Sequence, residues 1–157
     1  MARAKESLTI TTPPGEDAGD IGEIRDIVGF HLRLAHGAVY RHFTETFVDL
    51  GLTQKQVSVL WLVGDHPGIA QTGLAQRMRM DRATTMAIIN RLEARSLLER
   101  GKSETDGRKQ SLNLTDDGRA MLATAKEAIR AHEEWLKSRY TAREVQLLIE
   151  LLTRLHE

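Results

Sequence analysis

The spacing of apolar residues between positions 81 and 95 constrains the fold more than any other feature of the chain. Four residues suited to a buried face recur there at intervals of three and four, namely Thr85, Ile88, Ile89 and Leu92. This interval places them on one side of an α-helix. Asp81 stands where such a helix needs an N-cap, so we expect a helix from this residue to about Arg95.

The segments before and after this helix define a motif. Apolar spacing predicts a short helix that begins near Gln71 or Thr72, although Ala70 is no helix cap. Two short strands are predicted after residue 95, at 98–102 and 110–114, joined by the turn-forming sequence SETDGRK. A short helix, a tight turn, a second helix and a basic hairpin, in this order, are typical of a winged helix-turn-helix.

Longer helices are expected upstream of the motif. The apolar spacing predicts one continuous amphipathic helix over residues 20–50, which Gly51 ends. Thr53 and Gln56 form a capping-box sequence, so a second helix is expected from there to about Val63.

Two more helices are expected downstream. Thr115 can cap a long helix that reaches about Ser138. Thr141 and Glu144 form another capping box, which predicts a last helix. Its apolar seam consists of Val145, Leu148, Leu152 and Leu155. We expect this seam to need a partner surface.

Composition narrows the class of protein. The chain has 157 residues, enough for one domain of ordinary size with a sizeable core. It has no cysteine, which excludes disulfides and thiolate metal sites and fits a reducing compartment. Apolar runs are too short to cross a membrane, and residues 1–20 lack the apolar core of a signal peptide. A cytoplasmic protein without membrane contact is therefore expected.

The formal net charge is zero, so the distribution of charge matters more than its sum. Residues 71–114 contain nine Arg or Lys against five Asp or Glu. The predicted motif is therefore moderately basic and lies between acidic ends.

The face of the 81–95 helix opposite its apolar stripe is polar, small and basic. Hydroxyl and amide groups there can hydrogen bond to bases or phosphates, alanines allow close approach to thymine methyl groups, and arginines offer forked donors. The candidate DNA-binding residues on this helix are Arg82, Ala83, Thr84, Ala87, Asn90, Arg91 and Arg95. The alternative is an ordinary solvated helix face.

The predicted hairpin adds a second candidate DNA contact. Arg108 and Lys109 supply cations at its tip, and Asp106 can orient the Arg108 guanidinium. A polar turn is the alternative, because turns collect Asp, Gly and Lys. The position of the hairpin directly after the helix pair favours a contact with DNA.

The sequence over residues 21–157 resembles the MarR family of bacterial and archaeal regulators. The resemblance rests on GLTQKQVSVLWLV, on LAQRMRMDRATTMAIINRLEARSLLER across the helix-turn-helix, and on DGRKQSLNLTDDGRAML through the hairpin and the next helix. Met86 and Ala87 depart from the family, which often has a basic or hydroxyl residue there. The resemblance therefore leaves the operator sequence open.

The resemblance implies a mainly α fold with a small β-hairpin wing: a winged helix-turn-helix domain plus a helical dimerisation region. Residues 1–18 are expected to form a flexible N-terminal arm, 19–50 and 115–157 the dimerisation region, and 51–114 the DNA-binding domain. The resemblance further implies a homodimer that binds an inverted repeat of double-stranded DNA, with Arg108 in the minor groove.

Candidate ligand-binding residues lie on the first two predicted helices. At about 100° per residue, Arg25 and His36 fall on one edge of the apolar stripe, and His42 falls on the other. Relatives in this family often bind aromatic or phenolic carboxylates beside these helices, which would make Trp61 a pocket wall. The alternative places Trp61 in an ordinary core.

No nucleophile elbow, phosphate loop or metalloprotease helix occurs in the sequence, so an enzyme is not expected and no cofactor is predicted. The histidines show no close metal-ligand spacing, so no metal site is predicted. We predict a repressor released by a small aromatic or phenolic carboxylate or its thioester. The alternatives are a metal-responsive or constitutive winged-helix regulator and, in another class, a winged-helix module that binds protein.

Overall fold

The computed structural model describes residues 21–102 and 110–157, and the side chains of positions 102 and 110 lie outside the description. The predicted arm over residues 1–18 therefore falls outside the described residues. The chain separates into two units, residues 1–36 and 37–157. Among the described residues, no helix has both the length and the apolar character that crossing a membrane requires.

The prediction of one continuous helix over residues 20–50 is wrong. A 3-10 helix, η1, covers Gly22–Asp26, and the α-helix α1 covers Val28–Thr46. The backbone of Ile27 between them is extended, with φ −89° and ψ 109°. Gly22, Ile27, Val28 and Gly29 are all poor helix formers, so this stretch lacks the propensity to carry the helix through.

The end of α1 also differs from the prediction. The hydroxyls of Thr44 and Thr46 donate to the carbonyls of Tyr40 and His42, at 2.9 and 2.7 Å. Such bonds to the preceding turn bend and weaken a helix end. After Phe47 the chain forms a second 3-10 helix, η2, at Val48–Leu50. Gly51 then closes the segment in the left-handed conformation that was expected of it.

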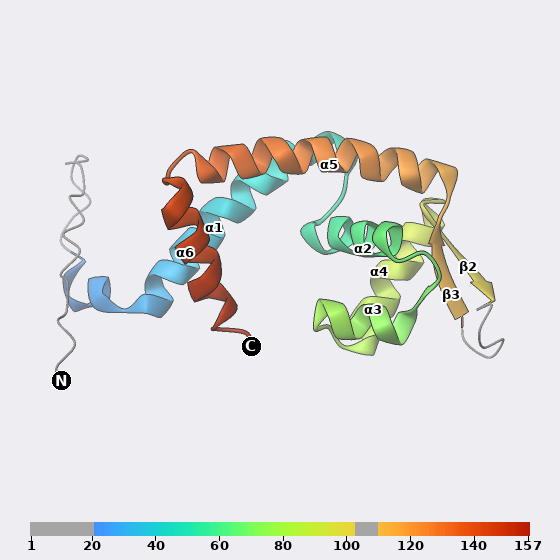
Figure 1. The fold of residues 1–157 in the computed structure, drawn as a ribbon, viewed down its shortest axis with the longest axis horizontal. Helices are drawn as coiled ribbons and strands as arrows, with labels where there is room; N and C mark the ends of the chain where they lie inside the picture. The colour runs from blue at the N-terminus through green and yellow to red at the C-terminus, as the bar shows by residue number, and fades with distance from the viewer. Residues whose placement is uncertain (1–20, 103–109) are drawn as a thin grey trace. The chain divides into compact units, whose positions relative to one another are not determined.

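The winged helix-turn-helix is built from three helices and a hairpin of two strands in the second unit, and Figure 1 shows their arrangement. The helices are α2 (Gln54–Asp65), α3 (Gln71–Met78) and α4 (Arg82–Ala94), and the hairpin strands are β2 (Leu98–Lys102) and β3 (Gln110–Leu114). The strand limits match the prediction, and the helix limits agree to within two residues. The fold class predicted from the sequence is confirmed.

A short third strand, β1 (Ile69–Ala70), was not predicted. It pairs antiparallel with β3, opposite Leu112 and Ser111, and gives the sheet the order β1-β3-β2. Two residues are too few to produce a hydrophobic period, so nothing in the local pattern marked this strand.

The helix ends follow the predicted capping chemistry. Thr53 and Gln56 form the reciprocal capping box, with the Thr53 amide donating to Gln56 Oε1 at 2.9 Å. Asp81 caps α4 through a bond from the Thr84 amide at 2.8 Å. The turn between α3 and α4 places Arg79 in the left-handed region, at φ 50°, and the Met80 amide then donates to the Ala75 carbonyl.

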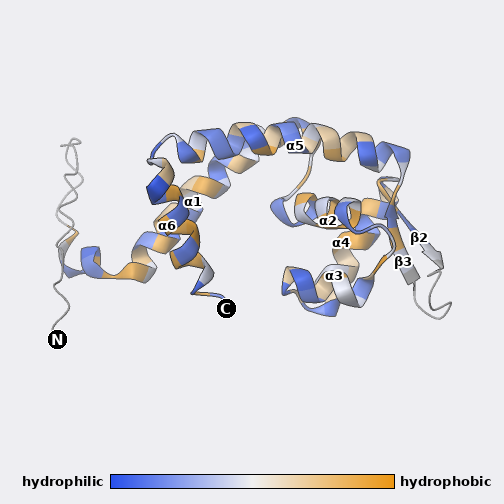
Figure 2. Ribbon diagram, in the orientation of Figure 1, coloured by the Kyte–Doolittle hydropathy of each residue, from blue (hydrophilic) through white to orange (hydrophobic). Residues whose placement is uncertain are grey.

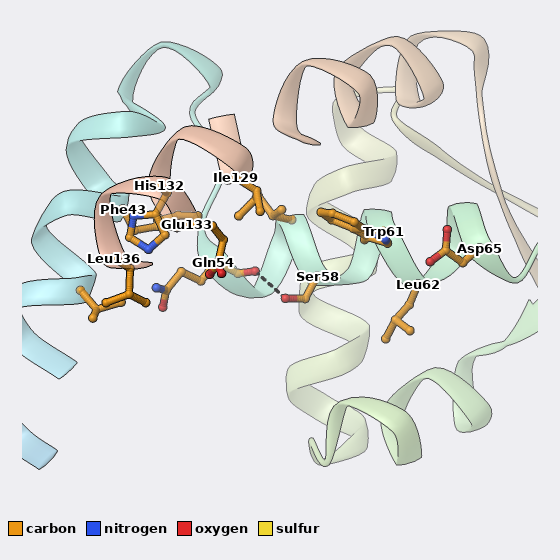
Figure 3. Close-up of a pocket in the computed structure, with 12 residues that line it drawn as sticks. Phe43, Gln54, Ser58, Trp61, Leu62, Asp65, Ile129, His132, Glu133 and Leu136 are labelled. Atoms are coloured by element: carbon orange, nitrogen blue, oxygen red, sulfur yellow. Dashed lines mark hydrogen bonds between the residues drawn. The ribbon is translucent and has the colours of Figure 1, made fainter. Parts of the chain in front are cut away.

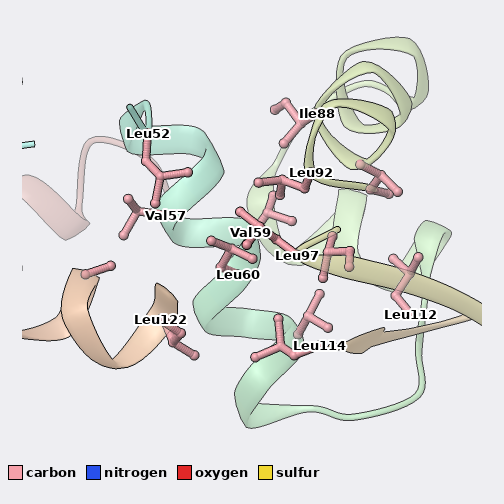
Figure 4. Packing of buried hydrophobic residues seen from close by; sticks show 14 of the residues in the cluster. Leu52, Val57, Val59, Leu60, Ile88, Leu92, Leu97, Leu112, Leu114 and Leu122 are labelled. Carbon is pink, nitrogen blue, oxygen red and sulfur yellow. The ribbon is translucent and has the colours of Figure 1, made fainter. Parts of the chain in front are cut away.

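The core lies where α2, α4 and the hairpin converge, and Figure 4 shows Leu60, Leu97 and Leu114 at this junction. Leu60, Ile89 and Leu92 are fully buried. The next helix, α5 (Asp116–Lys137), begins with a close approach to this core. A side chain at Gly118 would place its Cβ 1.9 Å from the Leu97 carbonyl oxygen, so only glycine fits there.

The last helix, α6 (Ala142–Thr153), has the predicted capping box at Thr141 and Glu144, with the Thr141 amide donating to Glu144 at 2.8 Å. It has no buried residue. Figure 2 shows apolar positions along its ribbon alternating with polar ones. Its exposed large apolar side chains are Leu147, Ile149, Leu151, Leu152 and Leu155 just beyond its end.

Candidate functional site

The outer face of α4 is the first candidate site. The buried residues of α4 are Thr85, Ile88, Ile89 and Leu92, which confirms the predicted stripe. Of the predicted DNA-binding residues on this helix, Thr84 is half-buried and the others are exposed, namely Arg82, Ala83, Ala87, Asn90, Arg91 and Arg95. The structure thus leaves the small and basic face of α4 open to a partner.

At the start of α4, Thr84 and Asp81 form a closed pair. The Thr84 hydroxyl donates to Asp81 Oδ2 at 2.6 Å, while its amide donates to Oδ1 at 2.8 Å. These two bonds, of which the bond from the hydroxyl has the larger effect, hold the pKa of the Asp81 carboxyl below its usual value. The Thr84 hydroxyl therefore has its proton engaged and presents its lone pairs to a partner.

At the other end of the helix, Arg95 is tied to the fold. Its two terminal nitrogens donate to the carbonyls of Gly51 and Leu50, at 2.8 and 3.0 Å. The guanidinium thereby satisfies the carbonyls at the end of η2 and anchors the C-terminus of α4. Arg95 therefore has a structural role, which the sequence did not reveal because the apolar spacing only placed it on the exposed face of the helix.

Asn90 contacts β2, which sequence reasoning missed. Asn90 Oδ1 accepts a hydrogen bond from Arg100 Nη2 at 2.6 Å. Arg100 Nη1 forms an ion pair with Glu93, one turn farther along α4. The Arg100 and Glu93 side chains are only 26% and 27% exposed, which protects the ion pair from full solvent screening.

The predicted wing contacts Asp106, Arg108 and Lys109 lie outside the described residues. Their assignment stays a prediction. The strands that carry this loop are in place, with Leu98 opposite Leu114 and Gly101 opposite Ser111.

A pocket of about 680 Å³ is the second candidate site. It lies along α2 and α5, with α1 contributing from its C-terminal half, and Figure 3 shows the side chains around it. Its apolar walls are Val39, Phe43, Val57, Trp61, Leu62, Ile129 and Leu136. Its polar lining residues are Gln54, Ser58, Asp65, His132 and Glu133. Two aromatic rings with a few polar groups are typical of a small-molecule site.

His132 is the buried polar residue of this pocket, with 5% of its surface exposed. Its Nδ1 lies 2.8 Å from Nδ1 of His42, and the His42 ring stacks on Trp135 at 3.9 Å between centroids. Burial, reinforced by the nearby His42, lowers the pKa of His132 from its ordinary value. The pocket therefore offers a neutral imidazole at neutral pH.

The charged residues of the pocket are carboxylates. Lys126 Nζ lies 3.9 Å from Asp65 Oδ1 and 4.6 Å from the centre of the Trp61 ring. Lys137 pairs with Glu133 at 3.0 Å. Each carboxylate thus has a lysine beside it, but no Lys or Arg is among the described lining residues.

The predicted ligand-binding residues have different outcomes. Trp61 is half-buried, and it both lines the pocket and packs against the hydrophobic core, so its role as a ligand contact stays a prediction. His42 contacts His132 but does not itself line the pocket. Arg25 and His36 are exposed residues of the first unit and are not among its lining residues. In the described residues, no three His, Asp or Glu side chains are grouped as metal ligands.

Sequence reasoning missed Phe43, Ser58 and His132. One signal was available for α2, because Gln54, Ser58, Trp61, Leu62 and Asp65 follow helical spacing on the face away from its core residues. No such signal existed for His132, whose importance comes from a contact with a residue ninety positions away.

The fold and these two sites are those of a winged helix-turn-helix regulator with a pocket along α2 and α5. The model of the MarR family matches residues 50–109. A putative transcriptional regulatory protein for the hcr operon of Thauera aromatica is 31% identical, over 92% of this chain and 89% of its own. The chain belongs to the MarR family of transcriptional regulators.

Solved structures agree with this assignment. The transcriptional repressor CouR bound to a 23-mer DNA duplex superposes with a TM-score of 0.83 and 32% identity, over 90% of this chain and 100% of that chain. CouR bound to p-coumaroyl-CoA superposes with a TM-score of 0.78 and 32% identity, over 86% and 95%. The similarity thus extends to both a DNA-bound and a ligand-bound structure.

Proposed function

We propose that the chain binds duplex DNA as a homodimer and represses transcription until an aromatic effector releases it. The exposed face of α4, which combines small, polar and basic residues, carries the DNA part of this proposal. The superposition with CouR bound to a DNA duplex supports it. Arg82, Ala83, Thr84, Ala87, Asn90 and Arg91 are the proposed contacts on α4, with Asp106, Arg108 and Lys109 on the wing.

We assign two tasks to different parts of the chain. Residues 51–114 contact DNA, while 19–50 and 115–157 form the dimer, and neither task falls to residues 1–18. The exposed leucines and isoleucine of α6 support the dimer, because an apolar face of this size rarely stays in contact with water. Two-fold symmetry then requires an inverted repeat with half-sites about one helical turn apart.

The chemistry of the pocket favours an effector whose aromatic head is neutral. Two carboxylates line the pocket, and the buried His132 is held in its neutral form, so a free carboxylate would find no cationic partner among the lining residues described. A phenol hydroxyl can instead donate to Glu133 or share a hydrogen bond with His132, while Phe43 and Trp61 enclose the ring.

An aromatic acid loses its negative charge when it becomes a thioester. The proposed effector is therefore a phenolic acyl thioester rather than the free acid, which narrows the sequence-based prediction. The relative CouR, whose structure holds p-coumaroyl-CoA, supports this choice. The thioester must bind the DNA-free state more tightly than the DNA-bound state, because only a difference in affinity can release DNA.

The test begins with duplexes that the purified protein selects from a random-sequence pool. Their affinity is measured by fluorescence anisotropy with added p-coumaroyl-CoA, free p-coumarate or coenzyme A. We expect the thioester alone to weaken DNA binding. Ser58→Leu should narrow the pocket and reduce this response without changing affinity for DNA, whereas Ala123→Leu, which adds a leucine at an exposed helical position outside the pocket, should leave the response intact.

Selection of no sequence would contradict DNA binding itself. Release by free p-coumarate, but not by the thioester, would contradict the neutral-head proposal and leave the regulator standing.

A further inference from the structure

We propose that Arg100 is a positioning residue that makes Asn90 a hydrogen-bond donor to the DNA major groove. This inference rests on the proposed DNA binding through α4. It assigns a chemical polarity to one base contact, which neither the fold nor the family similarity specifies.

The contact between the two side chains determines which end of the amide faces the groove. Asn90 could turn either its oxygen or its NH2 group toward Arg100, but a guanidinium can only donate hydrogen bonds. The oxygen therefore accepts from Arg100, at 2.6 Å. The NH2 group is the part of Asn90 left for another partner.

The Arg100 guanidinium is itself held in place. Its second terminal nitrogen forms the ion pair with Glu93, so one guanidinium spans two residues of α4 that are one turn apart. Arg100 stands in the middle of β2, opposite Leu112 of β3. A planar fork bound at both ends on a paired strand resists rotation, and this fixes the Asn90 amide with it.

This arrangement has a consequence for base recognition. Asparagine reads adenine best by presenting its oxygen and its NH2 group together, to N6 and N7. With the oxygen held on the β2 side, Asn90 presents the donor alone. A single donor matches the major-groove acceptors: N7 and O6 of guanine, N7 of adenine, or O4 of thymine.

The experiment uses the full-length protein and a duplex that the wild type selects from a random pool. Asn90→Asp keeps the size of the side chain and an acceptor for Arg100 but removes the donor. We expect it to lose about tenfold in affinity, the scale of one hydrogen bond to a base. The purines of the duplex are then replaced one at a time by 7-deaza analogues, which lack N7. If the acceptor is N7, one of these replacements should lower the affinity of the wild type for the duplex and leave the affinity of Asn90→Asp unchanged. If it is an oxygen, single replacements of guanine by 2-aminopurine or of thymine by 5-methyl-2-pyrimidinone should show the same difference.

Arg100→Met tests the positioning role. It keeps an apolar stem on β2 but frees the Asn90 amide to rotate, so the base preference at that one position should broaden. Arg100→Lys, which can still donate to Asn90, should restore part of the preference. Arg91→Met removes the same charge from α4 itself and should lower affinity for all sequences alike.

Three results would overturn the inference. Asn90→Asp could bind as tightly as wild type, or no single base replacement could distinguish the two proteins. Alternatively, a folded Arg100→Met protein, checked by circular dichroism, could lose affinity uniformly with its base preference intact. Failure of the proposed function is different, because the wild type would then select no sequence at all, and the inference would fall with it.

Discussion

The helices α4 and α6 have almost the same length, 13 and 12 residues, yet α4 buries its apolar face within the chain and α6 leaves its own exposed. α4 buries four residues within its own chain and exposes a polar, basic face. α6 buries none and exposes large apolar side chains, with Ile149 at 58% and Leu151 at 47%. The first helix is complete in one chain, whereas the second is not.

This difference shows why amphipathic spacing alone does not reveal what a helix does. Both helices have regular apolar spacing and a side-chain cap at Thr141 or Asp81. What separates them is whether the single chain supplies a surface for the apolar face. The core of the winged unit uses the face of α4, and the face of α6 is left for a second copy of the chain under the proposed function.

The largest expected effect comes from charging the apolar face of α6. Leu152→Glu together with Leu155→Glu should convert the dimer to a monomer, because each buried carboxylate would lose its hydration in the interface. Affinity for the selected duplex should then fall by about 10²- to 10⁴-fold, since two linked half-site contacts become one. Sedimentation velocity and fluorescence anisotropy measure the two losses.

Gln146→Glu together with Arg143→Gln is the matched control, since it makes the same change of two units of charge on α6 at exposed polar positions. It should leave the dimer intact. A Leu152→Glu, Leu155→Glu protein that still sediments as a dimer would place the interface elsewhere and break the contrast between the two helices.

A smaller effect distinguishes an apolar residue of the core from one on the exposed face of α6, by how each changes the free energy of unfolding. Leu60→Ala should lower the free energy of unfolding by about 2–5 kcal/mol, because it leaves a cavity in the packed core. This loss should be the same at low and high protein concentration. Leu151→Ala should instead give a loss that depends on concentration, because its contacts form only when the dimer does.

Urea unfolding at several protein concentrations measures both variants. If Leu60→Ala and Leu151→Ala both lost stability independently of concentration, α6 would be packed within its own chain.

Local chemistry allowed much of this contrast to be predicted. The limits of β2 and β3, the buried stripe of α4 and the capping boxes at Thr53 and Thr141 all follow from interactions within a few residues. Caps and turns depend on residues that are close together in the sequence, so they can be predicted from it.

Long-range pairs could not be predicted in this way. The contacts of Asn90 with Arg100, of Arg95 with Gly51 and of His42 with His132 join different elements. Each depends on how the elements pack, and the residue types alone permit many partners. The break at Ile27 was missed for a different, local reason: the apolar spacing continues through a segment whose helix propensity is low, and the prediction followed the spacing.

The smallest expected effect is a pH dependence that comes from His132, the last buried residue of α5 before α6 begins. Burial and then His42 lower its pKa below the ordinary 6.5, while Glu133 opposes the shift. The folded protein therefore binds this proton less readily than the unfolded chain does. The resulting stabilisation is fully present above about pH 6.5 and is lost as pH falls from there through the lower pKa of the folded state.

His132→Gln should flatten the dependence of the unfolding free energy on pH in this window. His42→Gln should weaken this dependence only in part, because it removes the influence of His42 but not the burial of His132. His66→Gln, at an exposed position, should leave it unchanged. Urea unfolding at pH values between 5 and 8 compares the four proteins. If His132→Gln kept the full slope, the acid sensitivity would belong to other groups, and the pocket imidazole would not be held neutral by its burial beside His42 and Phe43.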